Sequence, residues 1–361
     1  MNTQSSTRLR RTALFEWHCA AGARLLPASG WEMPFLYENV NDEVRAVRQN
    51  CGVFDLSHQA QMRFEGEGVT QWLNEIVSAD WESVAPGRAA YALLLNERGG
   101  VIDDVMGYRL SADAWLLIAN DSRAQVNEAH FRAHLPDGIE MNVGGEDSAL
   151  IALQGPKSQE ILQKLIGESL AEVAWRDVIL MGGTEAVLAR SGDCGGDGFE
   201  IVLNADDAPA LWKALLRCGA VPCGLGAREV LRIEAALPLF GRELREDWTP
   251  AESGVAFAAQ TAKPRFIGRA ALLEKLEISH TIQALRMNDE AVARDADRVL
   301  DANGQTIGEI TSGAFSPTLG CGIALAHLPR NSEIGDEVSV EVDGVFHGAQ
   351  VVTAFIPTER K

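Results

Sequence analysis

A glycine pair between two apolar runs is the feature that constrains the fold of this chain most. Gly99 and Gly100 separate residues 91–95 from residues 101–106, and a third apolar run follows at 114–119. Short apolar runs joined by a glycine turn are typical of neighbouring antiparallel strands, because glycine accepts the positive φ angles of tight turns. The sequence therefore predicts an antiparallel meander, and helical spacing of apolar residues upstream makes this region α+β.

A second region with mixed patterns follows the meander. Residues 148–153 predict a strand, Pro156 predicts the first turn of a helix, and residues 199–203 predict another strand. Asp206 and Asp207 are expected to cap the helix after that strand. This second region is therefore also α+β.

After about residue 280 the chain becomes rich in β patterns. Asn303-Gly304 and Asp343-Gly344 predict hairpin turns, and valines at every second position from 338 to 342 predict a half-buried strand. A small β-barrel or sandwich is the expected closure. Because 361 residues are too many for one core, we expect several domains. The predicted domains are residues 12–145, 146–275 (with the linker) and 276–361.

The charge balance restricts the ligands of the protein. The chain has 32 Lys and Arg residues against 51 Asp and Glu residues, and its net charge of −19 repels nucleic acids and anionic membrane surfaces. It has no apolar run long enough to span a membrane, no secretion-signal pattern and no metal-site spacing among its six cysteines. We therefore expect a cytoplasmic protein with reduced thiols and no metal. An anionic ligand would need a local cluster of Arg or Lys.

A glycine-rich segment at residues 190–200 suggests three motifs, and its residues fit none of them. A phosphate loop needs Lys and Ser or Thr where Phe199 and Glu200 stand, and a dinucleotide loop opens a helix rather than a strand. A calcium loop starting at Asp193 needs a carboxylate where Asn204 stands. The segment is then a tight turn leading into a strand. Either Glu200 is a solvated acid, or the loop backbone approaches a flat ligand closely.

Three other groups are candidates for chemistry, each with a structural alternative. Asp103 and Asp104 point to opposite faces of a strand, so at most one enters a given pocket, and either fits a solvated turn. Arg228 and Arg232 lie four residues apart on one helix face, which is either the required cationic site or an exposed face with ion pairs. His58 is the one histidine to inspect. No Ser-His-Asp or Cys-His arrangement follows from the spacing.

Several segments of the chain match one family in the same order. They are GWEMP at 30–34, GVFDLSH at 52–58, GGVIDD at 99–104, ALQGP at 152–156, DGFE at 197–200, GLGAR at 224–228, TSG at 311–313 and FSPTLG at 315–320. Together they make the chain, from about residue 12 to 357, resemble the aminomethyltransferase (T-protein) family of the glycine cleavage system and its folate-dependent relatives. Each segment alone is weakly specific, whereas the ordered set is highly specific.

The resemblance implies an α+β fold of three domains, arranged as a cloverleaf around a central folate channel, with a small β-barrel as the last domain. It implies an enzyme with tetrahydrofolate as cofactor and a lipoylated carrier protein as partner. Such an enzyme takes an aminomethyl group from the carrier, releases ammonia and forms 5,10-methylenetetrahydrofolate.

The same resemblance assigns roles to individual residues. Asp104 is the catalytic acid that faces the reactive pteridine nitrogens, and Glu200 holds the amino and ring N–H donors of the pterin. A carboxylate suits both roles, because it accepts charge-assisted hydrogen bonds and stabilises the positive charge that develops as the amine leaves. We expect Asp104 to act by electrostatics and orientation rather than as a nucleophile. The other residues mapped to the folate pocket are Tyr91, Tyr108, Asn120 and Arg228.

Three departures from the family pattern leave the one-carbon donor open. Asp193-Cys194-Gly195-Gly196 stands where the family has Tyr-Thr-Gly-Glu, and Gln59-Ala60 stands where it has Met-Gly. Phe257 and Gln260 replace Trp and Lys. The alternatives are therefore a folate-dependent demethylase of a small methylated metabolite or aryl ether, and a non-catalytic folate-binding accessory protein.

A lipoylated carrier would need a basic patch on this acidic protein in order to dock. Lys263, Arg265 and Arg269 are the predicted patch.

Overall fold

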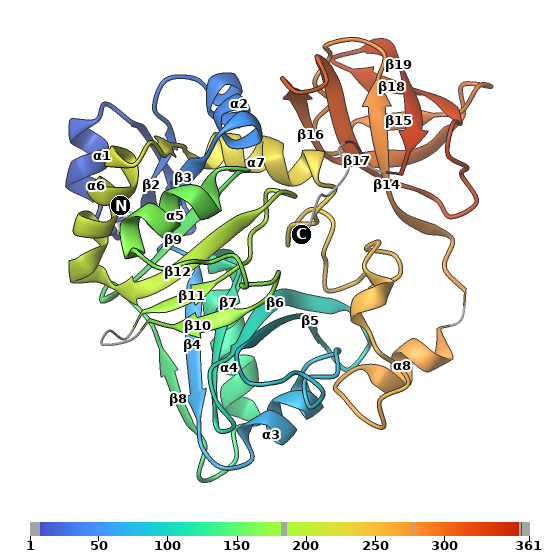
Figure 1. Cartoon of the computed structure of the whole chain (residues 1–361). Helices are drawn as coiled ribbons and strands as arrows, with labels where there is room; N and C mark the ends of the chain where they lie inside the picture. Colours follow the sequence, from blue (N-terminus) through green and yellow to red (C-terminus); the bar gives the residue numbers. More distant parts are fainter. Residues whose placement is uncertain (1–7, 182–185, 276, 354, 356–361) are drawn as a thin grey trace, which may run out of the picture.

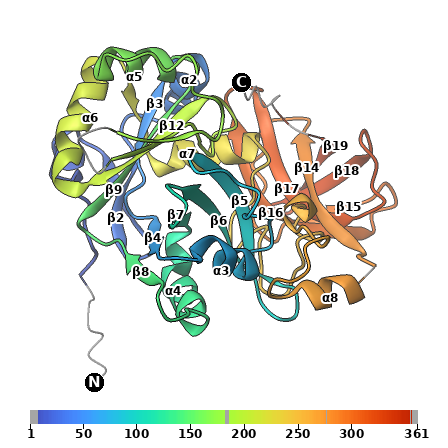
Figure 2. The same cartoon turned by 60° about the horizontal axis from the view of Figure 1, so that its bottom comes forward.

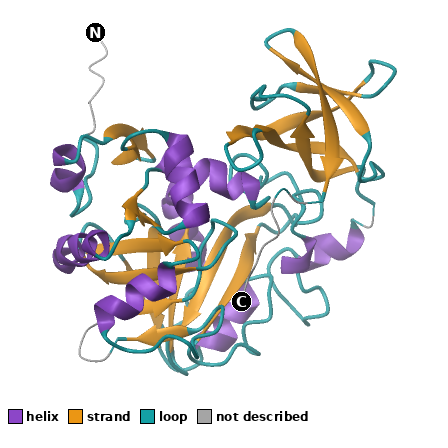
Figure 3. Ribbon diagram, turned by 45° about the horizontal axis from the view of Figure 1, so that its top comes forward, coloured by secondary structure: helices purple, strands orange, loops and turns teal. Residues whose placement is uncertain are grey.

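The computed structural model describes residues 8–181, 186–275, 277–353 and 355. It contains two large β-sheets, each with helices, a small two-stranded sheet of β1 and β2, and a closed β-barrel (Figure 1). Figure 3 shows that the barrel wall consists of strands, whereas the helices gather around the other two units. The predicted α+β class with a C-terminal barrel is confirmed. Within the described ranges, no helix is long and apolar enough to cross a membrane.

The first sheet contains the predicted meander. Its order is β5-β6-β7-β4-β8, and α3 and α4 pack on one face (Figure 2). Gly99, at φ +80°, turns the chain between β5 and β6, and a Cβ on Gly100 would lie 1.8 Å from the carbonyl oxygen of Glu246. Both positions therefore require glycine. The elements are β4 (Ala60–Glu65), α3 (Val69–Ile76), β5 (Arg88–Leu95), β6 (Val101–Arg109), β7 (Ala114–Ala119), η1 (Asp121–Arg123), α4 (Ala124–Ala133) and β8 (Glu140–Val143).

The second sheet joins strands from both sides of the first predicted boundary. Its order is β10-β11-β12-β9-β3-β13, in which β3 pairs antiparallel with β9 and parallel with β13. The elements before residue 60 are α1 (Phe15–Ala20), β1 (Arg24–Ala28), β2 (Trp31–Leu36), α2 (Val40–Gln49) and β3 (Gly52–Asp55). The later elements are β9 (Ser148–Gln154), α5 (Ser158–Ile166), β10 (Val178–Leu180), β11 (Val187–Ala189), β12 (Gly198–Asn204), η2 (Ala205–Asp207), α6 (Ala208–Arg217), β13 (Val221–Pro222) and α7 (Leu225–Glu234).

The packing of two segments differs from the predicted division into domains. Leu14 and Val53 are buried with Ile151 and Trp212, so the N-terminal elements join the second sheet rather than the first. The linker, with η3 (Ala256–Ala258) and α8 (Arg269–Glu274), packs on the first sheet instead of the second, through residues such as Phe266. In both cases the apolar face of a distant strand attracts the segment, and neighbourhood in sequence does not decide the packing.

Two local predictions are wrong by a few residues. Pro156 lies two residues before α5, which begins at Ser158. The turn η2 before α6 is capped by Asn204, whose side chain accepts a hydrogen bond from the Asp206 N–H, whereas Asp207 makes no side-chain capping bond to α6. Asn and Asp are both good capping residues, so composition could not choose between them.

The barrel closes in the strand order β14-β17-β16-β15-β18-β19. Both predicted hairpins are confirmed, since residues 303–304 turn between β15 and β16 and residues 343–344 between β18 and β19. Val338, Val340 and Val342 are buried, as their alternation predicts. The strands are β14 (His280–Met287), β15 (Arg298–Leu300), β16 (Thr306–Ser316), β17 (Cys321–Pro329), β18 (Glu337–Val342) and β19 (Val345–Val352). Residues 356–361 of the third predicted domain lie outside the described residues.

One apolar core connects all three parts of the molecule. Val230 and Leu231 of α7 belong to the same buried cluster as Tyr108 of the first sheet, Ala152 of the second sheet and Leu325 of the barrel. Helix α7 therefore lies where the three parts meet, as Figure 1 shows. Side chains near this helix are in a position to combine residues from different units.

Candidate active site

Strand β6 carries two adjacent acids, Asp103 and Asp104, just before the residues that pair with β7. Asp103 is fully buried and accepts hydrogen bonds from the backbone N–H and side-chain amide of Asn120 and from Asn127 on α4. Asp104 accepts a 2.7 Å hydrogen bond from the same Asn120 amide. Asp104 shares its strand face with Tyr108, which belongs to the core between the sheets. The predicted residue, Asp104, is therefore the acid on the side of the second sheet.

The two carboxyl groups perturb each other. Burial, and then the negative charge of Asp104, raise the pKa of Asp103 to about 8. Burial also raises the pKa of Asp104, while the hydrogen bond from Asn120, the nearby hydroxyl of Tyr91 and the charge of Arg228 oppose that shift. Two acids this close do not ionise independently, so they titrate as a coupled pair.

Tyr91 on β5 connects this acid pair with the protein surface. Among the described residues its buried hydroxyl has no partner with hydrogen-bond geometry, and burial and the charge of Asp104 raise its pKa well above the ordinary value. The ring of Tyr91 stacks against the ring of Phe257, with 6.1 Å between their centroids, and Phe257 is 73 % exposed. An orphaned hydroxyl beside a carboxylate is typical of a position that a ligand completes.

Glu200 on β12 approaches the same region from the second sheet. It is 8 % exposed and accepts a 2.5 Å hydrogen bond from the hydroxyl of Tyr108 on β6. Burial raises the pKa of Glu200, although the bond from Tyr108 opposes the shift. The interpretation of Glu200 as a solvated acid is therefore wrong. Asp104 and Glu200 face one region from two different sheets, with Tyr108 between them.

The glycines before Glu200 leave room for the buried side chain of Gln154. A Cβ on Gly192 or on Gly198 would lie 2.0–2.5 Å from the amide atoms of Gln154. The Gln154 amide donates to the carbonyl of Ser191 at 3.0 Å, so this loop wraps around one buried glutamine side chain. At Gly192 and Gly198 the close backbone approach is therefore to the side chain of Gln154.

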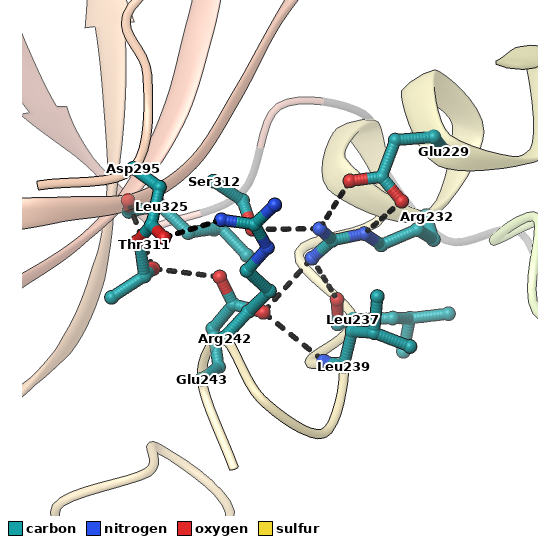
Figure 4. A network of polar contacts seen from close by, with 10 residues as sticks. All are labelled: Glu229, Arg232, Leu237, Leu239, Arg242, Glu243, Asp295, Thr311, Ser312 and Leu325. Atoms are coloured by element: carbon teal, nitrogen blue, oxygen red, sulfur yellow. Dashed lines mark hydrogen bonds and ion pairs between the residues drawn. The ribbon is translucent and has the colours of Figure 1, made fainter. Parts of the chain in front are cut away.

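The two arginines of α7 have separate partners and do not form a joint cationic site. Arg228 is ion-paired with Asp193 of the glycine-rich loop at 2.5 Å. Arg232 is 6 % exposed and donates to Glu229, Glu243, Ser312 of the barrel and the Leu237 carbonyl. Figure 4 shows this network, in which Glu243 also accepts a hydrogen bond from Thr311.

His58 lies near the ion pair of Arg228 and Asp193. So does Asp121, which the sequence does not single out. His58 is 5 % exposed, its Nδ1 has no partner among the described residues, and burial lowers its pKa, so that its imidazole is neutral. Asp121 has a buried oxygen that also lacks a described partner, and its charge acts on both His58 and Arg228. Asn127 is likewise unpredicted, although a signal existed: it shares an apolar helix face with Phe131.

Comparisons with known proteins agree along the whole chain. The model of the GCVT N-terminal domain matches residues 14–263, and that of the glycine cleavage T-protein C-terminal barrel domain matches residues 281–356. An aminomethyltransferase of Thermotoga maritima is 37 % identical over 96 % of each chain, and one of Symbiobacterium thermophilum is 41 % identical over 95 % of this chain and 96 % of the relative. The crystal structure of glycine cleavage system aminomethyltransferase T from Bartonella henselae superposes with a TM-score of 0.91 at 30 % identity, covering 98 % of this chain and 99 % of the other.

This chain belongs to the aminomethyltransferase family. The resemblance noted in the sequence is thereby confirmed, and so are the enzyme class and the glycine cleavage T-protein fold. The pairing of Arg228 with Asp193 is then notable, because Asp193 stands at one of the positions where the sequence departs from the family pattern.

The three cations of the predicted docking patch of this aminomethyltransferase differ in their exposure. Lys263 is 7 % exposed, and its ammonium donates to three backbone carbonyls of residues 74–79, with burial lowering its pKa to about 8. Arg265 pairs with Glu75, and Arg269 donates to the Thr261 carbonyl. The cavity of about 410 Å³ beside Lys263 is lined by Glu75, Asp80 and Glu82 as well as by Arg265. Lys263 therefore holds the linker on the first sheet, whereas the side chain of Arg265 is 72 % exposed.

Proposed function

We propose that this aminomethyltransferase binds tetrahydrofolate between the two sheets, with Asp104 and Glu200 as its acidic contacts, and takes its aminomethyl group from a lipoylated carrier protein. One observation carries the proposal. Two carboxylates of raised pKa lie on strands of different sheets, and Tyr108 hydrogen-bonds from the strand of one to the strand of the other. Buried acids of this kind are candidates for ligand binding and catalysis.

The residues present suit a reduced pterin. The pterin edge offers amino and ring N–H donors, and a carboxylate that already accepts from a phenol retains lone pairs for further donors. Glu200 meets this requirement, and the orphaned hydroxyl of Tyr91 beside Asp104 offers a further polar group. Tyr108 and Asn120 fix the two acids, and Arg228 completes the polar set.

The chemistry assigned to Asp104 is electrostatic. In the transfer, the C–S bond to the carrier and the C–N bond to the leaving amine break, and two C–N bonds to the folate nitrogens form. The two protons leaving those nitrogens end on the carrier sulfur and on ammonia. Positive charge develops on the carbon as it changes partners, and the Asp104 carboxylate, fixed by Asn120, stabilises that charge without forming a bond.

The alternative functions receive no specific support. The relatives named above carry the name aminomethyltransferase, and the comparisons favour neither a demethylase nor an accessory protein.

Two measurements test the proposal in sequence. Calorimetry with tetrahydrofolate should give saturable binding, and the aminomethylated lipoyl carrier should then release ammonia when protein and tetrahydrofolate are both present. Absence of binding would reject the folate site. Binding without ammonia release would reject the lipoylated carrier as donor and leave the folate site standing.

A further inference from the structure

Asp103 is a fully buried acid to which the proposed chemistry gives no task. Neighbouring residues of a strand point to opposite faces, so Asp103 and Asp104 lie on different sides of the first sheet. Val105, on the face of Asp103, packs in the core that includes residues of α3 and α4, whereas Tyr108, on the face of Asp104, belongs to the core shared with the second sheet. Asp103 therefore lies behind the sheet as seen from the candidate folate site, where a ligand beside Asp104 does not reach it.

Two asparagines donate hydrogen bonds to Asp103. Asn127 of α4, which is itself fully buried, donates from its side-chain amide. Asn120, at the end of β7, donates from its backbone N–H at 3.2 Å and from its side-chain amide at 2.7 Å. The carbonyl oxygen of the Asn127 amide is buried without a partner among the described residues. A buried orphan oxygen is unfavourable, so the bond to Asp103 is the polar contact that Asn127 provides.

The side-chain amide of Asn120 links the two acids. The nitrogen that donates to Asp103 at 2.7 Å also donates to Asp104 at 2.7 Å. An NH₂ group has two hydrogens, so it can serve both carboxyl groups at once. Asn120 makes two bonds to Asp103 and one to Asp104, and Asn127 fixes Asp103 from α4. The direction of the amide is therefore set from the buried side of the sheet, and its second hydrogen points to Asp104.

This arrangement matters because the proposed task of Asp104 is electrostatic. A carboxylate stabilises a developing positive charge best when its direction is fixed before the reaction begins. Within the described ranges, the amide of Asn120 is the one group that forms a hydrogen bond of good geometry with the Asp104 side chain, since the nearby hydroxyl of Tyr91 lacks that geometry. If Asn120 turned away, Asp104 would lose its fixed donor.

We propose that Asp103 is a positioning residue for the transfer reaction: held by Asn127 from behind the sheet, it fixes the amide of Asn120, which in turn orients the carboxylate of Asp104. The inference rests on the proposed function, because that function assigns the transfer to Asp104. It deepens the function by giving a role to the buried acid beside Asp104.

Two substitutions of Asp103 separate positioning from charge. Asp103→Leu removes the acceptor of Asn120 and should lower kcat for ammonia release about tenfold or more, with KM for tetrahydrofolate changed less than about twofold, because the orientation of Asp104 counts most in the transition state. Asp103→Asn keeps an oxygen for Asn120, and its NH₂ can donate to the unpartnered carbonyl of Asn127 once that amide turns over. D103N should therefore keep kcat within about threefold.

Control variants identify the route of the effect. Thr70→Val removes a buried hydroxyl that accepts from Trp115 in the same core, and it should leave kcat unchanged. The double variant D103L/N120L should be no slower than N120L alone, because both residues act in one chain of hydrogen bonds. Unchanged kcat in D103L, equal losses in D103L and D103N, or additive losses in the double variant would each overturn the proposal.

Amide hydrogen exchange followed by NMR tests the same chain without turnover, and it covers the case in which D103L does not fold. The backbone N–H of Asn120 donates to Asp103, so its exchange should remain slow in Asp104→Asn. Fast exchange in D104N would mean that Asp104 holds Asn120, and it would overturn the proposal. If the unaltered protein releases no ammonia, the proposed function fails and the role of Asp103 fails with it. Ammonia release together with fast exchange in D104N rejects only the assignment of Asp103.

Discussion

Helix α7 carries two arginines four residues apart, and their surroundings are opposite in character. Arg232 faces the barrel and distributes its donors over Glu229, Glu243 and Ser312, almost without solvent contact. Arg228 faces the glycine-rich loop, has one acidic partner and keeps about a fifth of its side chain exposed. The same residue type on the same helix therefore serves two purposes, and saturation of its hydrogen bonds distinguishes them.

Two of the segments that match the family, TSG at 311–313 and FSPTLG at 315–320, form the interface of the barrel with the rest of the protein. Ser312 bonds Arg232, Thr311 bonds Glu243, and Ser316 bonds Glu234 at the end of α7. These hydroxyls come from the TSG and FSPTLG segments, so both segments hold the barrel against α7 and the chain that follows it; Figure 4 shows the contacts of Thr311 and Ser312. The site between the two sheets is different, because its buried groups include atoms of Tyr91, His58 and Asp121 that have no partner among the described residues.

The first prediction tests the structural role of Arg232. Arg232→Met should lower the free energy of unfolding by about 3–5 kcal/mol, because it leaves Glu243 buried without its cation. Arg228→Met is the matched control and should cost about 1 kcal/mol or less, since its pair is partly exposed. Urea unfolding of both variants measures the difference. Equal losses in the two variants would mean that hydrogen-bond saturation does not separate the two roles.

The second prediction concerns Asp104 in the candidate active site. Asp104→Asn should reduce kcat for ammonia release by about a hundredfold or more, because it removes the charge that stabilises the developing cation. Its unfolding free energy should stay close to that of the unaltered protein, since burial disfavours the ionised form of Asp104. Asp113→Asn, an exposed acid in the turn before β7, is the control. Full turnover with unchanged folate affinity in D104N would refute the role of Asp104.

The same contrast explains what the sequence could predict. Turns and alternation are local, so the meander, both barrel hairpins and the buried valines of β18 follow from the sequence. The pairing of β3 with β9 joins residues about a hundred positions apart, and no local pattern records it. Spacing alone also does not decide whether Glu200 is a solvated acid in a turn or a contact to a ligand. Its burial depends on Tyr108 from another sheet.

The two arginines of α7 show most directly what sequence spacing cannot predict. Spacing places Arg228 and Arg232 on one helix face, but only the tertiary structure supplies Asp193 to one and the barrel to the other. Lys263 of the predicted basic patch is buried for the same reason, because it donates to three backbone carbonyls that no sequence pattern predicts. The roles mapped onto Asp104, Tyr91 and Asn120 remain predictions, supported by their proximity.

The third prediction measures the stability cost of the site. The pKa of Asp103 is about 8 in the folded protein and near 4 when unfolded, so between these values the folded state binds more protons. Unfolding free energy should therefore fall as pH rises through this window, by up to about 1.4 kcal/mol per pH unit from this group. Asp103→Asn should lose that contribution, seen as a flatter stability profile between pH 6 and 7 in urea titrations. In D104N the window should end at lower pH, because the charge that raises the pKa of Asp103 is gone.

The smallest effect should come from the acid that is already satisfied within the protein. Glu200→Gln keeps the shape of the side chain and an acceptor for Tyr108, but it turns charge-assisted bonds to the pterin into neutral ones, which should weaken tetrahydrofolate binding about tenfold. Tyr108→Phe is the control, since it removes the hydrogen bond to Glu200 without removing the charge, and it should weaken binding less. Calorimetry with 6-methyltetrahydropterin should give the same ratio for E200Q as tetrahydrofolate does, because Glu200 is expected to contact the pterin end. A loss confined to tetrahydrofolate would place Glu200 at the tail of the ligand instead of at the pterin and would refute its proposed role.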